Sequence, residues 1–164
     1  MLNRYEKILK REIRNSRKFY KNSEINIISV NSTTKDFALG IIKRLNDKFS
    51  LNFKINLIEY QFLEDIELMD NSILILPIEG VFVSFFMYNL TKDEKYKKMI
   101  KRKDNFYNIA YSLSEFYIAK YLEKSPKIFC KNEALLRRIY DLVSINEKFI
   151  SGLENSLEFI SRLI

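Results

Sequence analysis

The spacing of apolar residues predicts alternating helices and strands in the first half of the chain. Between residues 3 and 20, apolar side chains recur at three- and four-residue steps, which predicts an amphipathic helix. Residues 25–30, 53–57 and 72–76 have the short, β-branched or alternating apolar patterns of strands. A helical pattern over residues 35–49 separates the first two strands. Strands that alternate with helices in this way favour a parallel sheet.

Helical spacing dominates the second half. It predicts four helices, over residues 80–101, 105–123, 133–143 and 153–164. The expected fold is a short three-layer α/β domain with a parallel sheet and a helical C-terminal half. We expect residues 1–164 to form a single domain, which consists of a basic N-terminal helix (1–21), a βαβ-type core (24–101) and a helical part (104–164).

Three scarce residue types narrow the possible chemistry. The chain has no histidine, which excludes His-based catalytic triads and His-ligated metals. A lone Cys130 excludes an internal disulfide and a Cys-rich zinc site. Only three glycines are present, and neither a Walker nor a dinucleotide-binding fingerprint occurs. We therefore expect no metal or cofactor, and a protein that binds or assists rather than catalyses.

The positive charge is concentrated in two segments. The net charge is +7, and residues 1–21 hold eight basic residues against two acidic ones. Residues 92–104 hold seven basic residues against three acidic ones. Two basic patches on a nearly neutral body are typical of a polyanion-binding surface, although solvated lysine-rich faces explain them equally well. The candidate RNA contacts are Arg4, Lys7, Lys10, Arg11, Arg14, Lys97, Lys98, Lys101 and Arg102.

The loop after the first strand is the candidate ligand site, because open α/β sheets bind ligands beyond the carboxyl ends of their strands. The loop reads Asn31-Ser32-Thr33-Thr34-Lys35-Asp36 and leads into a helix. The N-terminus of that helix favours an anion, and Lys35 adds a positive charge. A Ser/Thr-rich helix cap without any ligand is the simpler interpretation.

This loop also resembles a known motif. Ser32, Lys35 and Asp36 match the Ser-Gly-Gly-Lys-Asp-Ser loop of the ATP pyrophosphatases that adenylate tRNA bases before thiolation. Thr33 and Thr34 replace the glycines that let the backbone approach pyrophosphate. Residues 32–36 therefore look like the remnant of a nucleotide loop.

The surrounding segments are similar to the cytoplasmic tRNA 2-thiolation protein 2 family. The basic helix with Lys10, Arg11 and Arg14 resembles the segment that precedes the loop in that family, and residues 101–121 resemble a later helix that carries Glu and Tyr. The family's cysteine pairs are absent. The resemblance implies a degenerate, adenine-nucleotide α-hydrolase-like fold and a non-catalytic partner subunit that binds tRNA and a catalytic thiolase subunit as a heterodimer. That complex would act in 2-thiolation of the wobble uridine.

Three other groups of residues are possible sites. Glu64, Asp65, Glu67 and Asp70 are acidic, but their spacing fits no oxygen cage for a divalent cation, which favours a solvated face. The adjacent Lys131 would lower the thiol pKa of an exposed Cys130, whereas a buried Cys130 would be a packing residue. Six tyrosines could stack on nucleic-acid bases, but their helical spacing with Phe and Leu favours a place in the core. They are Tyr88, Tyr96, Tyr107, Tyr111, Tyr117 and Tyr121.

The leading functional hypothesis is therefore a cytoplasmic tRNA-thiolation partner with no membrane association. Two alternatives stay open at this point. One is a structural or interaction module of a larger assembly, with no role in tRNA modification. The other is an active nucleotide enzyme that uses the altered loop and Lys35.

Overall fold

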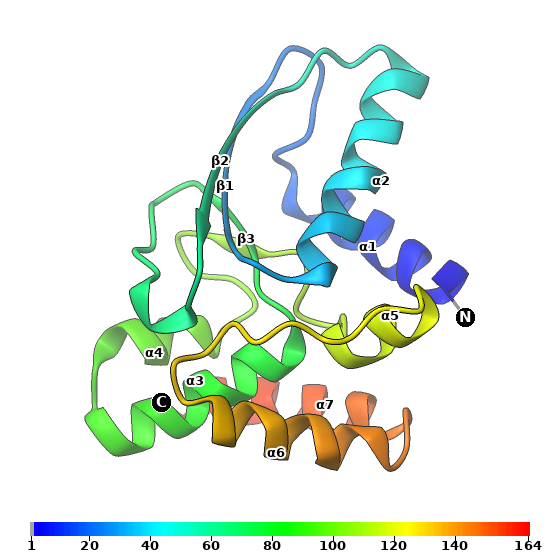
Figure 1. The fold of residues 1–164 in the computed structure, drawn as a ribbon. Coiled ribbons are helices and arrows are strands. Elements are labelled where there is room, and N and C mark those ends of the chain that lie inside the picture. The colour runs from blue at the N-terminus through cyan, green and yellow to red at the C-terminus, as the bar shows by residue number, and fades with distance from the viewer. Residues whose placement is uncertain (1) are drawn as a thin grey trace.

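A computed structural model describes residues 2–164 and shows an α/β fold built on a four-stranded, all-parallel sheet (Figure 1). The strand order is β2-β1-β3-β4. The strands are β1 (Glu24–Val30), β2 (Lys54–Tyr60), β3 (Ile73–Ile75) and β4 (Tyr107–Asn108). Helices flank the sheet, so the predicted fold class is confirmed.

The helices of the described residues follow the apolar spacing of the sequence in most places. They are α1 (Leu2–Ser16), α2 (Thr33–Phe49), α3 (Ile78–Thr91), α4 (Glu94–Met99), α5 (Glu115–Tyr121), α6 (Glu133–Ser144) and α7 (Phe149–Leu163), with a short 3-10 turn at Leu63–Asp65. Figure 1 shows α1 and α2 together on one side of the sheet. Helices α3, α6 and α7 lie together beyond the end of the sheet at which β1 finishes. None of the described helices has the length and apolar character that a membrane crossing requires.

Strand β1 forms the centre of the sheet, and its position follows from its composition. Ile27, Ile28 and Val30 are fully buried, because β2 and β3 cover both edges and helices cover the faces. Strand β2 is an edge strand, where Leu57 and Ile58 are exposed. The carboxyl end of β1 therefore lies in the middle of the molecule, at the point where the candidate ligand loop (residues 31–36) begins.

Two predicted helices are wrong in their extent. The pattern over 80–101 is two helices, because Lys92 adopts a left-handed conformation (φ 58°) that ends α3. Asp93 then caps α4 by accepting a hydrogen bond from the Lys95 N–H at 2.9 Å. The N-terminal helix also ends earlier than predicted, at Ser16, followed by Arg17 at φ 55°.

The predicted helix over 105–123 is replaced by strand β4, a turn and the shorter helix α5. The buried Asn108 side chain explains the change, since it bonds both backbone groups of Leu76, accepting from its N–H at 3.2 Å and donating to its carbonyl at 2.9 Å. These bonds hold residue 108 at the end of β3 and compete with helix formation. Ser114 then caps α5 by accepting from the Tyr117 N–H.

Candidate functional site

The carboxyl ends of β1 and β3 meet at the point where the sheet topology reverses. From β1 the chain crosses to β2 on one side, whereas β3 and β4 lie on the other side. In open α/β sheets this switch point is where a ligand binds. Here it is formed by the 31–36 loop, which leads into α2, and by the start of α3 at Ile78 and Glu79.

A side chain of the protein itself occupies the anion position at the start of α2. The Glu115 carboxylate, fully buried, accepts the N–H of Thr33 at 2.9 Å and the N–H of Thr34 at 2.8 Å. It also accepts the Thr34 hydroxyl at 2.8 Å and the Lys127 N–H at 3.1 Å. These are the contacts that the N-terminus of a helix would offer to a phosphate group.

The next two N–H groups of the first turn of α2 are also taken. The Lys35 N–H donates to the Ser32 hydroxyl oxygen at 3.0 Å, and the Asp36 N–H donates to the Ser32 carbonyl. Residues 33–36 therefore offer no free N–H group to a ligand. The helix-cap interpretation of this loop explains Ser32 fully, and Glu115 takes the place of an external anion.

A second buried carboxylate supports the first. Glu79 accepts the Ser114 hydroxyl at 2.5 Å, the Glu115 N–H at 3.0 Å and the Phe116 N–H at 3.3 Å. Burial raises the pKa of Glu79 to about 7, although these hydrogen bonds act to lower it. Glu79 thus caps α5, and the first residue of α5 caps α2, so two carboxylates join three helices.

Lys35 and Asp36 are paired with each other rather than presented to a ligand. Lys35 Nζ lies 2.8 Å from Asp36 and 2.5 Å from Glu59 at the end of β2. Partial burial acts to lower the pKa of Lys35, but the hydrogen bonds to Asp36 and Glu59 outweigh it and the pKa is raised. Asp36 also pairs with Lys127 at 3.3 Å. Ser32, Thr33 and Thr34 are buried as well, so the side chains of residues 32–36 are engaged within the protein.

Helix α1 presents the strongest concentration of free positive charge. Tyr5, Leu9 and Ile13 are buried on one face of this helix. The opposite face is exposed and carries five cations at positions spaced by three or four residues along the helix, namely Arg4, Lys7, Lys10, Arg11 and Arg14. Of these, Lys10 pairs with Glu6 at 2.6 Å and Arg11 contacts Glu12 at 3.1 Å, whereas no described side chain forms an ion pair with the other three.

Helix α7 borders this basic face and forms an open cleft with α1. Arg4, Lys7 and Arg11 line the cleft from α1, and Ser151 and Asn155 line it from α7. Glu154 also lines the cleft, but its carboxylate pairs with Arg102 at 2.5 Å. The three cations therefore exceed the acidic charge of the cleft and lie beside neutral hydrogen-bonding groups, a composition that suits phosphate oxygens. The sequence indicated the cations, but it gave no indication that α7 lies beside them.

Arg102, one of the predicted RNA contacts, is not free to bind RNA, because its guanidinium group is paired with acidic side chains. It donates to Glu12 at 3.1 Å, to Glu154 at 2.5 Å and to Glu158 at 2.9 Å. Its guanidinium also lies 4.6 Å from the centre of the Tyr111 ring. Burial acts to lower the pKa of Arg102, but the carboxylates, Glu12 first, outweigh it and raise it further. Arg102 thus joins α1 to α7, and the neighbouring Lys101 and Lys103 line a shallow cavity with Glu158, Ser161 and Arg162 of α7.

The other predicted cations do not form one surface with α1. Lys97 and Lys98 lie on α4, which Figure 1 shows far from α1 across the sheet. Lys97 pairs with Glu94 at 3.5 Å, and Lys101 pairs with Asp104 at 3.8 Å. The second basic cluster of the sequence is therefore divided in space, and Arg102 is the member that contacts α1.

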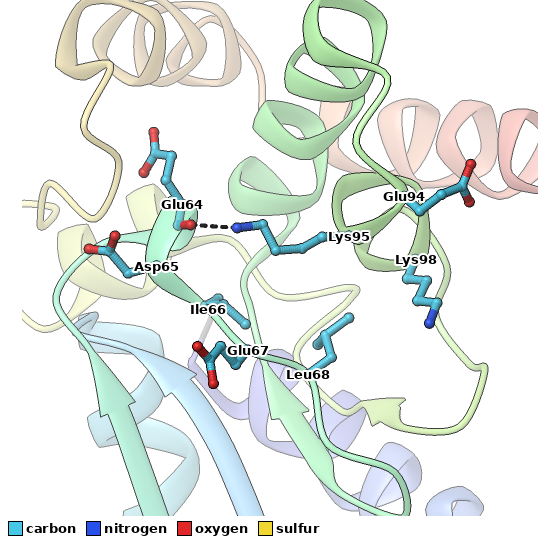
Figure 2. Close-up of a pocket in the computed structure, with 8 residues that line it drawn as sticks. All are labelled: Glu64, Asp65, Ile66, Glu67, Leu68, Glu94, Lys95 and Lys98. Carbon is cyan, nitrogen blue, oxygen red and sulfur yellow. Dashed lines mark hydrogen bonds between the residues drawn. The ribbon is translucent and has the colours of Figure 1, made fainter.

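The predicted acidic cluster lines a pocket with α4 (Figure 2). Glu64, Asp65 and Glu67 line it together with Lys95 and Lys98, and Lys95 Nζ donates to the Glu64 carbonyl oxygen at 2.6 Å. The carboxylates of Glu64 and Asp65 point away from these lysines, and that of Asp65 pairs with Lys131 at 2.6 Å. Asp70 lies apart and accepts from the Asn105 amide. Across residues 2–164, no three acidic or thiol side chains converge as metal ligands would.

Cys130 is buried and its thiol donates to Glu64 Oε1 at 2.9 Å. Burial, followed by this hydrogen bond, raises the pKa of the thiol to about 12. A thiol in this state is a poor nucleophile near neutral pH. Of the six tyrosines considered for base stacking, Tyr96, Tyr107, Tyr111 and Tyr117 are buried in the core, and Tyr88 and Tyr121 are half-buried against it.

No protein-family profile, curated protein or solved structure matches this chain.

Proposed function

We propose that this protein is a non-catalytic RNA-binding subunit that holds tRNA through the basic face of α1. One observation carries the proposal: Glu115 fills the anion position of the sheet, while the cations of α1 face outward. A nucleotide enzyme would need that anion position for its substrate. A binding subunit needs only the outer surface, and this chain has kept cations there.

The cleft between α1 and α7 supplies the phosphate contacts in this proposal. Arg4, Lys7 and Arg11 provide the charge, and Ser151 and Asn155 provide hydrogen bonds to phosphate oxygens. Lys10 and Arg14 extend the positive surface along the backbone of the RNA. Contacts of this kind position the RNA and do not read its sequence.

The salt dependence of tRNA affinity tests this proposal. Binding of labelled tRNA to the purified protein should weaken steeply between about 50 and 200 mM salt, as expected when several counterions are released. The triple variant Lys7→Ala/Arg11→Ala/Arg14→Ala should reduce the slope of log K against log salt by about one for each phosphate that is no longer neutralised. A matched control is Lys43→Ala/Lys54→Ala/Lys124→Ala, because these lysines lie off α1.

A flat salt dependence, or equal effects of the triple variant and its control, would contradict the assignment of α1 as the RNA-binding face. The variants should fold normally, because all six side chains point into solvent. Unchanged circular dichroism and melting temperature verify this point.

The resemblance to the tRNA 2-thiolation family gives the proposal its specific form. In this form the subunit pairs with a catalytic thiolase subunit and assists 2-thiolation of the wobble uridine. Mass spectrometry of tRNA nucleosides from cells that lack the protein tests it, with an expected loss of 2-thiouridine. An unchanged level of 2-thiouridine would remove this form of the proposal and leave RNA binding to be judged by the salt experiment.

A second candidate function has its own observation. Several large apolar side chains on or next to α3, α6 and α7 are exposed; the most exposed are Ile145 (79%), Leu90 (75%), Leu163 (69%) and Phe159 (62%). Apolar side chains mark a protein interface when they gather in one patch, which is what this candidate function requires of them. If the protein co-purifies with an assembly that has no tRNA-modification role and binds no tRNA, a structural module replaces the RNA-binding subunit.

A further inference from the structure

A groove between α1 and α2 continues the basic face on the side away from α7. Its floor is apolar and consists of Ile41, Leu45 and Phe49 of α2. Its rim is charged and consists of Glu6 and Lys10 of α1 together with Arg44 and Lys48 of α2. The cavity measures about 350 Å³, near the lower end of the range for small-ligand sites, ~300–1,000 Å³.

Phe49 is the unusual residue of this groove. It is the last residue of α2, is 58% exposed and is absent from the side chains that pack against the core. The Nζ of the adjacent Lys48 lies 5.3 Å from the centre of the ring. An exposed aromatic ring beside cations is the arrangement with which proteins stack unpaired nucleic-acid bases.

The charges of the rim select a negatively charged occupant. Glu6 is the single carboxylate of the groove, and Lys10 at 2.6 Å and Arg44 at 3.5 Å already compensate it. Arg44 keeps 66% of its side chain exposed, and Lys48 is exposed as well. The rim therefore has cations in excess, directly beside the ring.

The size of the groove favours a nucleotide over an acidic helix of a protein partner. An amphipathic helix is bound through several anchors spaced over two turns, each of which needs its own pocket. The α1–α2 groove is a single small cavity with one exposed ring. A base and its phosphate use one aromatic surface and adjacent cations, which is what the groove contains.

We infer that the α1–α2 groove binds one unpaired nucleotide of an RNA, with its base stacked on Phe49 and its phosphate held by Lys10, Arg44 and Lys48. This inference rests on the proposed RNA-binding function, because Lys10 belongs both to the groove and to the basic face of α1. It adds a preference for unpaired over paired nucleotides, which the basic face of α1 lacks. Paired regions of the RNA would contact α1, and a single-stranded loop or end would reach the groove.

Two labelled RNAs of equal length distinguish this site from general charge attraction. One is a hairpin with an unpaired loop of seven nucleotides, and the other is a fully paired duplex. Phe49→Ala should weaken hairpin binding by about 5- to 150-fold, which corresponds to the ~1–3 kcal/mol of one stacked base. Binding of the duplex should stay unchanged. Tyr20→Ala is the matched control, since Tyr20 is 64% exposed and lies outside the groove.

The variant Phe49→Trp provides a direct signal, because the chain has no other tryptophan. It should retain hairpin binding, and its fluorescence should be quenched by the hairpin but not by the duplex. The inference is overturned if Phe49→Ala leaves hairpin affinity unchanged or weakens the binding of both RNAs equally. It is also overturned if an acidic peptide, rather than the hairpin, quenches the fluorescence of Phe49→Trp. In these cases wild-type RNA binding still supports the proposed function, whereas a wild-type protein that binds neither RNA refutes both.

Discussion

Replacement of Glu115 by alanine tests whether this side chain takes the role of a bound anion. The substitution removes the acceptor for the N–H groups of Thr33, Thr34 and Lys127 and for the Thr34 hydroxyl. Hydrogen bonds to a charged group contribute ~1.5–3 kcal/mol each, so four of them would amount to about 6 kcal/mol or more if none were replaced. Water that enters the vacated space will satisfy some of the donors. We therefore expect a destabilisation of about 3–5 kcal/mol, typical of breaking a buried charged interaction.

The free energy of unfolding, measured by urea titration with circular dichroism, gives this destabilisation directly. A chain of this size should also show a decrease in Tm of roughly 6–20 °C. Glu67→Ala is the control, because Glu67 is exposed and makes no hydrogen bond among the described residues; its effect should stay within about 0.5 kcal/mol.

Added anions make the test specific to the anion role. Inorganic phosphate or sulfate should bind the helix end that Glu115→Ala leaves open, and a concentration 100 times the Kd should restore about 2.7 kcal/mol. The wild-type protein should gain much less, because its N–H groups are occupied. The reasoning is refuted if Glu115→Ala costs under 1 kcal/mol, or if phosphate stabilises both proteins equally.

Three further predictions concern other buried groups. The pKa of Glu79 is raised from 4.5 to about 7 in the folded protein, so its contribution to stability is complete below pH 4.5 and is lost as the pH rises through 7. Urea titrations should show that the free energy of unfolding decreases by about 3 kcal/mol over this range. Glu79→Gln should remove this pH dependence. Arg102→Met should destabilise the protein by about 3–5 kcal/mol, because it leaves the buried Glu12 with the exposed Arg11 as its remaining ion-pair partner among the described residues. An effect no greater than that of the exposed Lys103→Ala, measured in the same way, would contradict the role of Arg102 between α1 and α7. Cys130, buried and with its pKa raised to about 12, should resist alkylation by iodoacetamide at pH 8 until the protein is unfolded in urea, so rapid labelling of the native protein would show that the thiol is accessible.

Local patterns in the sequence were sufficient for the elements that local interactions define. The apolar runs of β1 and β2 and the Ser32 cap of α2 depend on neighbouring residues, and the structure confirms them. The break between α3 and α4 is hidden because apolar spacing continues across it. The Lys92-Asp93 pair marks the break, and Asp93 is a usual N-cap residue that could have identified it.

Long-range interactions account for the features that the sequence did not reveal. Glu115 lies 82 positions from Thr33, and nothing in the spacing of either segment links them. Arg102 looks like any other cation of a basic run until Glu12, Glu154 and Glu158 are found around it. Charge counts indicate where cations occur along the chain, but ion pairing decides which of them are free for a ligand.

The contacts between α1 and the C-terminal helices also have a consequence for how this chain folds. Tyr5 donates to Glu147, 142 positions away, and Glu12 is held by Arg102, 90 positions away. Interactions of such long sequence separation slow folding, because loop entropy is lost before they stabilise the chain. During synthesis, residues 2–16 would emerge before the segments that cover their apolar face, and a helix of this length is only marginally stable without such packing. The row of cations along α1 would therefore be assembled late, together with the closing of the core.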